Sequence, residues 1–212
     1  MFFKNKGLLV FPICLLMIVL ASNSAYSQEE YRSLTGNNRV KVSGFGGPLM
    51  SFTSIGDDFA HMMGGGGGLI VGNFFFGGYG MGQTITIPYP GGNPDEDFLQ
   101  YGHGGLWFGF IIAPNAAIHP TFHVQCGWGS ISKKTKLDIG SADKHDIEDY
   151  NLSNRDAIYV VNPTFELEAN VSKFFKIGAG ANYSFVYGVQ SMKQTDFWKP
   201  GVFLSFKFGW FA

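Results

Sequence analysis

Residues 159–171 alternate regularly between two kinds of side chain. The odd positions are apolar: Tyr159, Val161, Pro163, Phe165, Leu167, Ala169 and Val171. From residue 162 onward the even positions are polar: Asn162, Thr164, Glu166, Glu168 and Asn170. Because successive side chains of a β-strand point to opposite faces, this period predicts a strand with one apolar and one acidic, polar face. Residues 177–187 repeat the pattern and predict a second strand.

Six further segments fit the same period less cleanly. They lie near residues 39–47, 62–71, 74–86, 99–112 and 118–131, and from about residue 202 onward. In the first three, glycine replaces many side chains, so the sequence specifies the strand register only weakly. The chain is therefore expected to be all-β, with about eight strands.

The composition points toward a membrane. Only 15% of the residues are charged, 17% are aromatic and 30 are glycine, whereas soluble domains average about 25% charge and about 7% glycine. After the N-terminal segment no apolar run is as long as a membrane-spanning helix, so a membrane form must cross by strands. The net charge of -1 gives no electrostatic reason to expect a nucleic-acid partner.

The N-terminus has the features of an export signal. Lys4 and Lys6 precede an apolar run over residues 7–20, and Ala25 and Ser27 occupy the small-residue positions of a cleavage site. We expect residues 1–27 to be a signal peptide and residues 28–38 a periplasmic segment before the barrel domain, residues 39–212. A membrane-anchoring helix is the alternative, but the run is short for one. The mature chain keeps one thiol, Cys126, which excludes an internal disulfide.

The expected connections alternate in length. Short turns fall near residues 72–73, 114–115 and 172–173, and long connections at 48–60, 86–98, 132–156 and 188–199. The long ones hold most of the mature acidic residues, as a solvated surface requires: Asp95, Glu96, Asp97, Asp143, Asp146, Glu148 and Asp149. Outer-membrane barrels alternate periplasmic turns with longer extracellular loops, so this order predicts a closed antiparallel transmembrane β-barrel. A soluble barrel such as a lipocalin is the alternative, although a small lumen holds too few side chains for these aromatics.

The chain resembles the small eight-stranded outer-membrane β-barrel proteins, the OmpA/OmpX-like group of Gram-negative bacteria. The most specific piece is the C-terminal run at residues 201–211, which is similar to the signal read by the barrel-assembly machinery. Such signals end on an aromatic residue, whereas Ala212 follows Phe211 here. Gln28 after the signal peptide is common in exported proteins of the Bacteroidetes. The resemblance implies outer-membrane lipid and the assembly machinery as partners, and it implies no single activity.

Candidate chemistry is sparse. Gly64–Gly68 lacks the Lys and Ser or Thr of a phosphate-binding loop, which favours a closely packed strand. His103, His119 and His123 share the face expected to line the lumen. However, His119 and His123 lie about 13 Å apart along a strand, which is too far for both to hold one metal ion. A hydrolase would need a set such as Ser130, His123 and Glu166, and nothing in their spacing singles them out. We therefore expect no catalytic, cofactor or metal site.

The carboxylates Glu166 and Glu168 are expected inside the barrel, where they need cationic partners. Lys41, Lys176 and Lys207 have the right parity, and Arg39 is a further candidate. Because the first and last strands must pair, Lys41 and Lys207 are expected to be near neighbours.

A narrow barrel filled by charged side chains favours a structural or surface-interaction role through the extracellular loops, above all residues 132–156, with an unknown partner. In this segment Lys133, Lys134 and Lys136 precede the acidic residues, so a folded-back hairpin is expected. A mobile, solvated loop is the alternative there. Porin-like passage of small solutes or ions is the second possibility for function, and a lipid-modifying enzyme is the third. Conductance in planar bilayers discriminates the second, and lipid A mass shifts discriminate the third.

Overall fold

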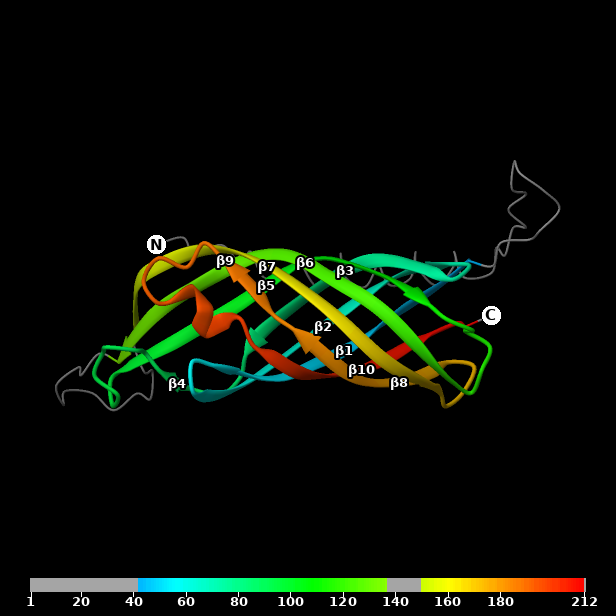
Figure 1. Cartoon of the computed structure of the whole chain (residues 1–212), viewed down its shortest axis with the longest axis horizontal. Helices are drawn as coiled ribbons and strands as arrows, with labels where there is room; N and C mark the ends of the chain where they lie inside the picture. Colours follow the sequence, from blue (N-terminus) through cyan, green and yellow to red (C-terminus); the bar gives the residue numbers. More distant parts are fainter. Residues whose placement is uncertain (1–41, 137–149, 212) are drawn as a thin grey trace, which may run out of the picture. The chain divides into compact units, whose positions relative to one another are not determined.

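The computed structural model describes residues 42–136 and 150–211 (Figure 1). The predicted signal peptide and periplasmic segment lie outside these residues, as do Arg39, Lys41 and the acidic residues at positions 143, 146, 148 and 149. Within the described part, no helix is long and apolar enough to cross a membrane.

Ten antiparallel strands pair in one sheet that closes on itself. Eight form the ring: β1 (Val42–Ile55), β2 (Asp58–Val71), β3 (Phe74–Gln83), β5 (Asp97–Ile111), β6 (Ile118–Lys136), β7 (Tyr150–Asn170), β8 (Phe175–Tyr183) and β10 (Pro200–Gly209). Two are accessory, since β4 (Ile87–Pro88) pairs only with β5, and β9 (Phe185–Tyr187) continues beyond β8 along β7. The last connection contains a 3-10 turn, η1 (Gln194–Phe197).

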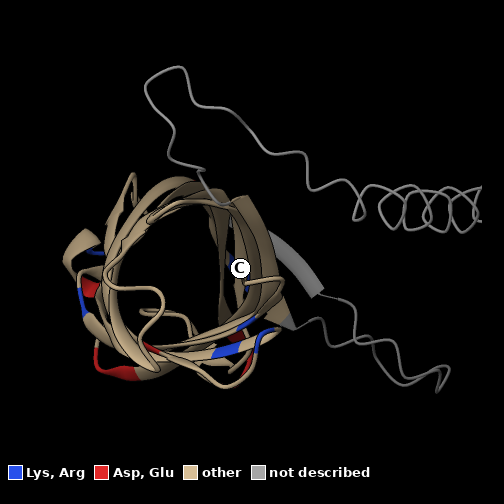
Figure 2. Cartoon of the chain, turned by 90° about the vertical axis from the view of Figure 1, so that its right-hand side faces the viewer, with Lys and Arg blue, Asp and Glu red and all other residues tan. Residues whose placement is uncertain are grey.

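Two pairings complete the ring. β1 pairs with β10 from Phe45↔Gly209 to Phe52↔Val202, and β3 pairs with β5 from Phe74↔Phe110 to Gly82↔Gly102. Figure 2 shows the resulting closed ring end-on. The predicted barrel of eight antiparallel strands is therefore confirmed.

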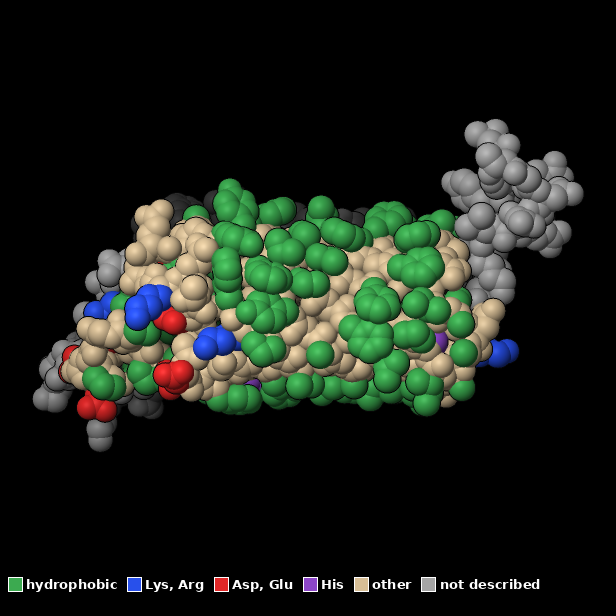
Figure 3. Space-filling model, in the orientation of Figure 1, with side chains coloured by type: hydrophobic (Ala, Val, Ile, Leu, Met, Phe, Trp, Pro, Cys, Tyr) green, Lys and Arg blue, Asp and Glu red, His purple; other side chains and the backbone are tan. Residues whose placement is uncertain are grey.

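The predicted faces are confirmed on β7. Tyr159, Phe165 and Leu167 are exposed on the outer wall, whereas Glu166 and Glu168 are buried inside. Other strands follow the same rule, and exposed apolar residues cover the wall: Leu106, Phe108, Phe122, Trp128, Val202 and Phe208. Figure 3 shows hydrophobic side chains over the face of the wall in view, with most charged side chains gathered at the end near β4. A soluble barrel with an apolar lumen and a polar exterior is excluded by this arrangement.

The three short turns lie at one end of the ring, as predicted. They connect β2 to β3, β5 to β6 and β7 to β8, at residues 72–73, 112–117 and 171–174. β10 also ends there (Figure 1). Following the arrangement of outer-membrane barrels, we refer to it as the periplasmic end and to the opposite end as extracellular.

The expected long connection at residues 48–60 is wrong. β1 continues to Ile55, β2 begins at Asp58, and a two-residue turn joins them with Gly56 at φ +59°. Pro48 interrupted the pattern in sequence because proline has no N–H to donate. In the ring Pro48 pairs with Gly65 of β2. On its other side the pairing of β1 with β10 is interrupted between Gly46 and Leu49, so the missing N–H donor is tolerated there.

The expected long connection at residues 132–156 is also partly wrong. β6 continues to Lys136 and β7 begins at Tyr150, with Lys136 opposite Tyr150 and Thr135 opposite Asn151. The folded-back hairpin is confirmed for the backbone of the two strand ends, which pair from Ile131↔Asp156 to Lys136↔Tyr150. Because residues 134–136 and 150–155 belong to paired strands, a shortened loop must be made within residues 137–149, which lie outside the described part.

Cys126 provides a test of the wall assignment. It pairs between Leu106 and Val161, and its even position on β6 directs it to the lipid. In native membranes we expect a charged, membrane-impermeant maleimide to leave it unmodified. Lys193→Cys in a Cys126→Ala background is the positive control, because residue 193 is exposed at the extracellular end. Ready labelling of Cys126 would contradict the assignment.

Candidate functional site

The inward face of β7 divides the interior into three layers. From the periplasmic end it presents the carboxylates Glu168 and Glu166, then Thr164 and Asn162, then two apolar residues, Val160 and Ile158. All six side chains are buried. Neighbouring strands add to each layer, so side-chain type changes from charged to apolar toward the extracellular end.

The charged layer is centred on Lys207. Its ammonium lies 3.0 Å from Glu166 Oε2 and also donates to Glu168 Oε1. Ser205 Oγ donates to the other oxygen of Glu166. The faces of Trp107, Phe75 and Phe45 lie 5.2, 5.5 and 5.8 Å from the Lys207 ammonium. A buried cation is therefore balanced by carboxylates and aromatic π-systems, as burial of charge requires.

Each of two histidines faces one of these carboxylates. His119 Nε2 lies 3.5 Å from Glu168 Oε2, and His123 Nε2 lies 3.4 Å from Glu166 Oε2. Trp107 Nε1 donates to His123 Nδ1 at 3.0 Å, which leaves the proton of a neutral His123 on Nε2, toward Glu166. Residues 42–136 and 150–211 contain no group of three His, Cys, Asp or Glu side chains able to hold a metal.

The predicted cationic partners are partly confirmed. Lys207 contacts both carboxylates, and Lys176 is buried opposite it in the register, with its ammonium 4.5 Å from the Phe211 ring. Lys41 and Arg39 lie outside the described residues. On β10, Lys207 lies between Ser205 and Phe208, which pair with Leu49 and Gly46 of β1. The β1 neighbours of Lys207 therefore come from residues 46–49.

The set Ser130, His123 and Glu166 is not brought together. His123 and Glu166 face each other, but Ser130 lies about 23 Å along β6 and has the opposite parity. The other rejected motif, Gly64–Gly68, is confirmed as part of β2. A Cβ at Gly66 would lie 3.0 Å from both Leu49 and Trp107, so glycine here makes room for an inward aromatic ring.

The extracellular third of the interior is mainly apolar, apart from the buried Asp97 at the start of β5. Ile131, Ile158 and Val186 are buried there, and Phe197 of η1 packs edge-on against Tyr101 at 5.7 Å. Trp198 Nε1 donates to the carbonyl of Val186 and so ties the last connection to β9. Side chains, including one from a connection, thus fill the extracellular part of the ring.

A cleft of about 550 Å³ lies at the extracellular end. Three connections form it: the β1–β2 turn, the segment around β4, and residues 191–199. Its apolar lining comes from Ile55, Ile87, Leu99 and Met192, and its charged lining from Asp57, Asp58, Asp196, Lys193 and Lys199. The amide of Gly56 donates to the Asp196 carbonyl at 2.8 Å, which joins two of the three connections.

Two further aspartates hold connections in place. Asp97 lies 2.8 Å from the Lys133 ammonium and accepts hydrogen bonds from Thr135 Oγ1 and the amide of Asn93. The hydrogen bonds from Lys133 and Thr135 lower the pKa of Asp97 to about 2. Asp156 accepts from the amides of Gln190 and Ser191 at 2.9 and 2.8 Å. Asp97 was expected to be a solvated loop residue, and this is corrected, because it is 6% exposed at the start of β5.

Sequence reasoning missed the cleft because its parts are distant along the chain. A signal was nevertheless present at one of them, since Gly56–Asp57 is a dipeptide typical of two-residue hairpins. Recognising it would have placed Asp57 and Asp58 at the extracellular rim.

The charged layer gives a stability test. Lys207→Met leaves two buried carboxylates without this cation and is expected to cost about 3–5 kcal/mol, the usual range for breaking a buried pair. Glu166→Leu should also lower the urea midpoint in lipid vesicles, but by less, because Glu168 still neutralises Lys207. The control is Glu96→Leu at an exposed position, where almost no change is expected. Unchanged midpoints in both interior variants would show that the layer is solvated.

Comparison with known proteins bears on the fold. No family model and no curated protein matches the sequence. Among solved structures, Neisserial surface protein A (NspA) aligns with a TM-score of 0.53 at 9% identity, over 82% of this chain and 100% of that chain. Ail, the attachment invasion locus protein of Yersinia pestis, aligns with a TM-score of 0.45 at 11% identity, over 80% and 97% of the two chains. The likeness to NspA shows the fold, a small β-barrel of eight strands, and the apolar outer wall is the surface that a membrane-spanning barrel presents to lipid.

Proposed function

We propose that the protein is a surface-interaction barrel whose extracellular cleft binds a partner outside the cell. The observation that carries this proposal is the cleft itself, whose lining combines apolar side chains with carboxylates and ammonium groups. A partner surface with an apolar group flanked by both signs of charge fits this lining. Such a mixed rim also favours one orientation of the partner.

The construction of the cleft supports a binding role. The two-residue β1–β2 turn contributes Asp57, and Asp58 is the first residue of the paired strand β2. The amide of Gly56 in this turn is hydrogen-bonded to the Asp196 carbonyl. On the other side Asp156 fixes residues 190–191, and Phe197 is anchored in the ring. Rigidly held connections lose little conformational entropy on binding, which favours affinity.

The interior supports this role over passage through the lumen. A solute moving along the axis would have to displace the Lys207 cluster, the adjacent aromatic rings and the apolar residues around Phe197. For an enzyme, a nucleophile would need to lie next to a base. The nominated Ser130 is far from His123, and we propose no catalytic role.

We propose that the barrel-assembly machinery recognises β10 and the adjoining Trp210 through their lipid-facing side chains, Leu204, Phe206, Phe208 and Trp210. Trp210 is exposed, whereas Phe211 lies over the Lys176 ammonium. The lipid-facing aromatic series therefore ends at Trp210.

Site-specific photo-crosslinking on intact cells tests the cleft. We expect a p-benzoylphenylalanine residue at position 193 to give a discrete adduct with a surface partner, and the same probe at the exposed position Asp95 to give none. Adding Asp58→Lys should abolish the adduct by reversing one charge of the rim.

A second arm separates the cleft from the neighbouring hairpin. Replacing residues 137–149 by a short Gly/Ser turn should leave the adduct at position 193 unchanged. Loss of the adduct in that variant would place binding in the predicted 132–156 segment. No adduct at position 193, or the same adduct at positions 193 and 95, would contradict the proposal.

A further inference from the structure

We propose that the outer wall of the barrel holds one acyl chain of a phospholipid in an oblique groove. The groove has a volume of about 700 Å³ and crosses five neighbouring strands, β3, β5, β6, β7 and β8. It is separate from the extracellular cleft, so this inference does not depend on the proposed function.

The floor of the groove is bare backbone. Five lining residues form one continuous row across the strands: Phe75, Gly109, His123, Thr164 and Asn182. The four that carry side chains are buried on the inner face of the sheet. They therefore present only main chain to the outside, and the depth of the groove comes from the outward residues on either side of this row.

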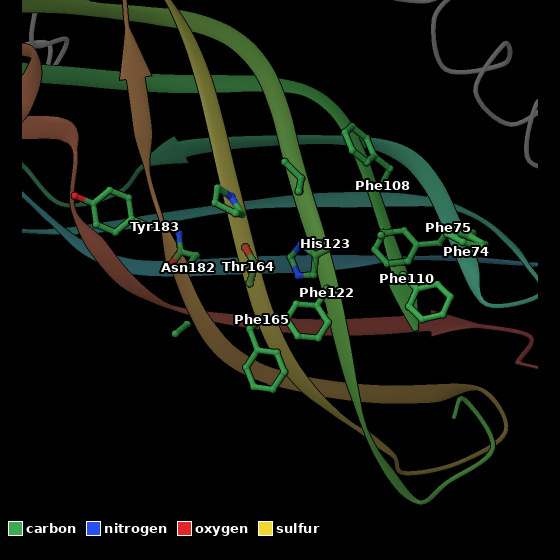
Figure 4. Close-up of a pocket in the computed structure, with 14 residues that line it drawn as sticks. Phe74, Phe75, Phe108, Phe110, Phe122, His123, Thr164, Phe165, Asn182 and Tyr183 are labelled. Carbon is green, nitrogen blue, oxygen red and sulfur yellow. The ribbon is translucent and has the colours of Figure 1, made fainter. Parts of the chain in front are cut away.

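One wall is aromatic along most of its length, and the other is low at its centre. Phe74 and Phe110 lie with their ring centroids 4.8 Å apart, and Phe122 and Phe165 are equally close, so paired rings form a continuous ridge. Ala181, which pairs with Phe165, ends this wall with a small side chain. The opposite wall holds Phe108, Val124, Pro163 and Tyr183, so its small side chains lie at its centre. Figure 4 shows the labelled rings of the ridge beside the row of His123, Thr164 and Asn182.

The groove rises obliquely through the membrane. Phe74 directly follows the periplasmic turn at residues 72–73, whereas Tyr183 pairs with Pro200, at the extracellular start of β10. Five strands spaced about 4.8 Å apart give a path of roughly 19 Å. With strands tilted by about 45°, that path rises roughly 13 Å, close to the depth of one leaflet in a core of about 30 Å.

The position of the groove decides its occupant. The outward lining residues belong to the lipid-facing wall, so the neighbouring medium is hydrocarbon. At the upper end Tyr183 donates to the Trp198 carbonyl and packs against Phe185 at 4.7 Å, which closes that end. The lower end begins at the exposed Phe74 ring, beside the periplasmic interface. A chain that enters there carries its head group on the periplasmic side, as a phospholipid of that leaflet does.

Two matched substitutions test the proposal. Ala181→Phe fills the groove, and Ala179→Phe places the same ring on the same strand and face but outside the groove. Each purified variant is delipidated, incubated with palmitoyl-oleoyl phosphatidylethanolamine vesicles and measured by native mass spectrometry. We expect one retained phospholipid on the wild type and on Ala179→Phe, and none on Ala181→Phe. Val124→Phe, on β6, is a second filling variant if the first fails to fold.

The alternative occupants give different results. Equal retention by the wild type and the folded filling variants would overturn the proposal, as would equal loss from Ala179→Phe and Ala181→Phe. Retention of lipopolysaccharide in place of phospholipid from a mixed sample would assign the groove to the outer leaflet and overturn it too. A dimer that disappears in Ala181→Phe would show that a second copy covers the groove.

Discussion

Pairing of β1 with β10 is the constraint on which the rest of the structure depends. In hydrocarbon an open sheet edge would leave N–H and C=O groups without partners, so strands can cross a membrane only when the sheet closes. Closure turns one face of every strand toward lipid and the other toward a narrow interior. The apolar wall and the polar interior follow from it, as does the need to fill that interior with side chains.

The side chains that fill the interior of the barrel depend on one another through close contacts across the ring. Glu166 can occupy its position because residue 178 is glycine, and a Cβ there would lie 2.1 Å from the Glu166 carboxylate. That carboxylate in turn holds the Lys207 ammonium, whose other side faces Trp107. The glycine at position 178 on β8 is therefore needed for the position of the buried Lys207 ammonium on β10, because Glu166 lies between them.

The sequence predicted most reliably where side chains alternate. On β7 and β8 apolar and polar residues differ clearly, and both strands and their faces were correctly expected. In β1 and β2 the glycines remove that contrast and Pro48 interrupts the pattern, so the sequence predicts Gly56–Asp57 within a long connection. The contact of Asp97 with Lys133 depends on strand register, which the glycine-rich strands β5 and β6 specify only weakly. The contact of Asp156 with Ser191 depends on the path of the last connection, which the alternation of side chains does not predict.

Closure can be measured directly by disulfide formation between β1 and β10. Met50 and Leu204 are directly paired. In a Cys126→Ala background, oxidation of native membranes should cross-link Met50→Cys to Leu204→Cys. The same β1 cysteine should not cross-link to Phe208→Cys, which lies about 13 Å farther along β10. Cross-linking only in the second pair, or in neither pair of a folded protein, would contradict the register and the closed ring.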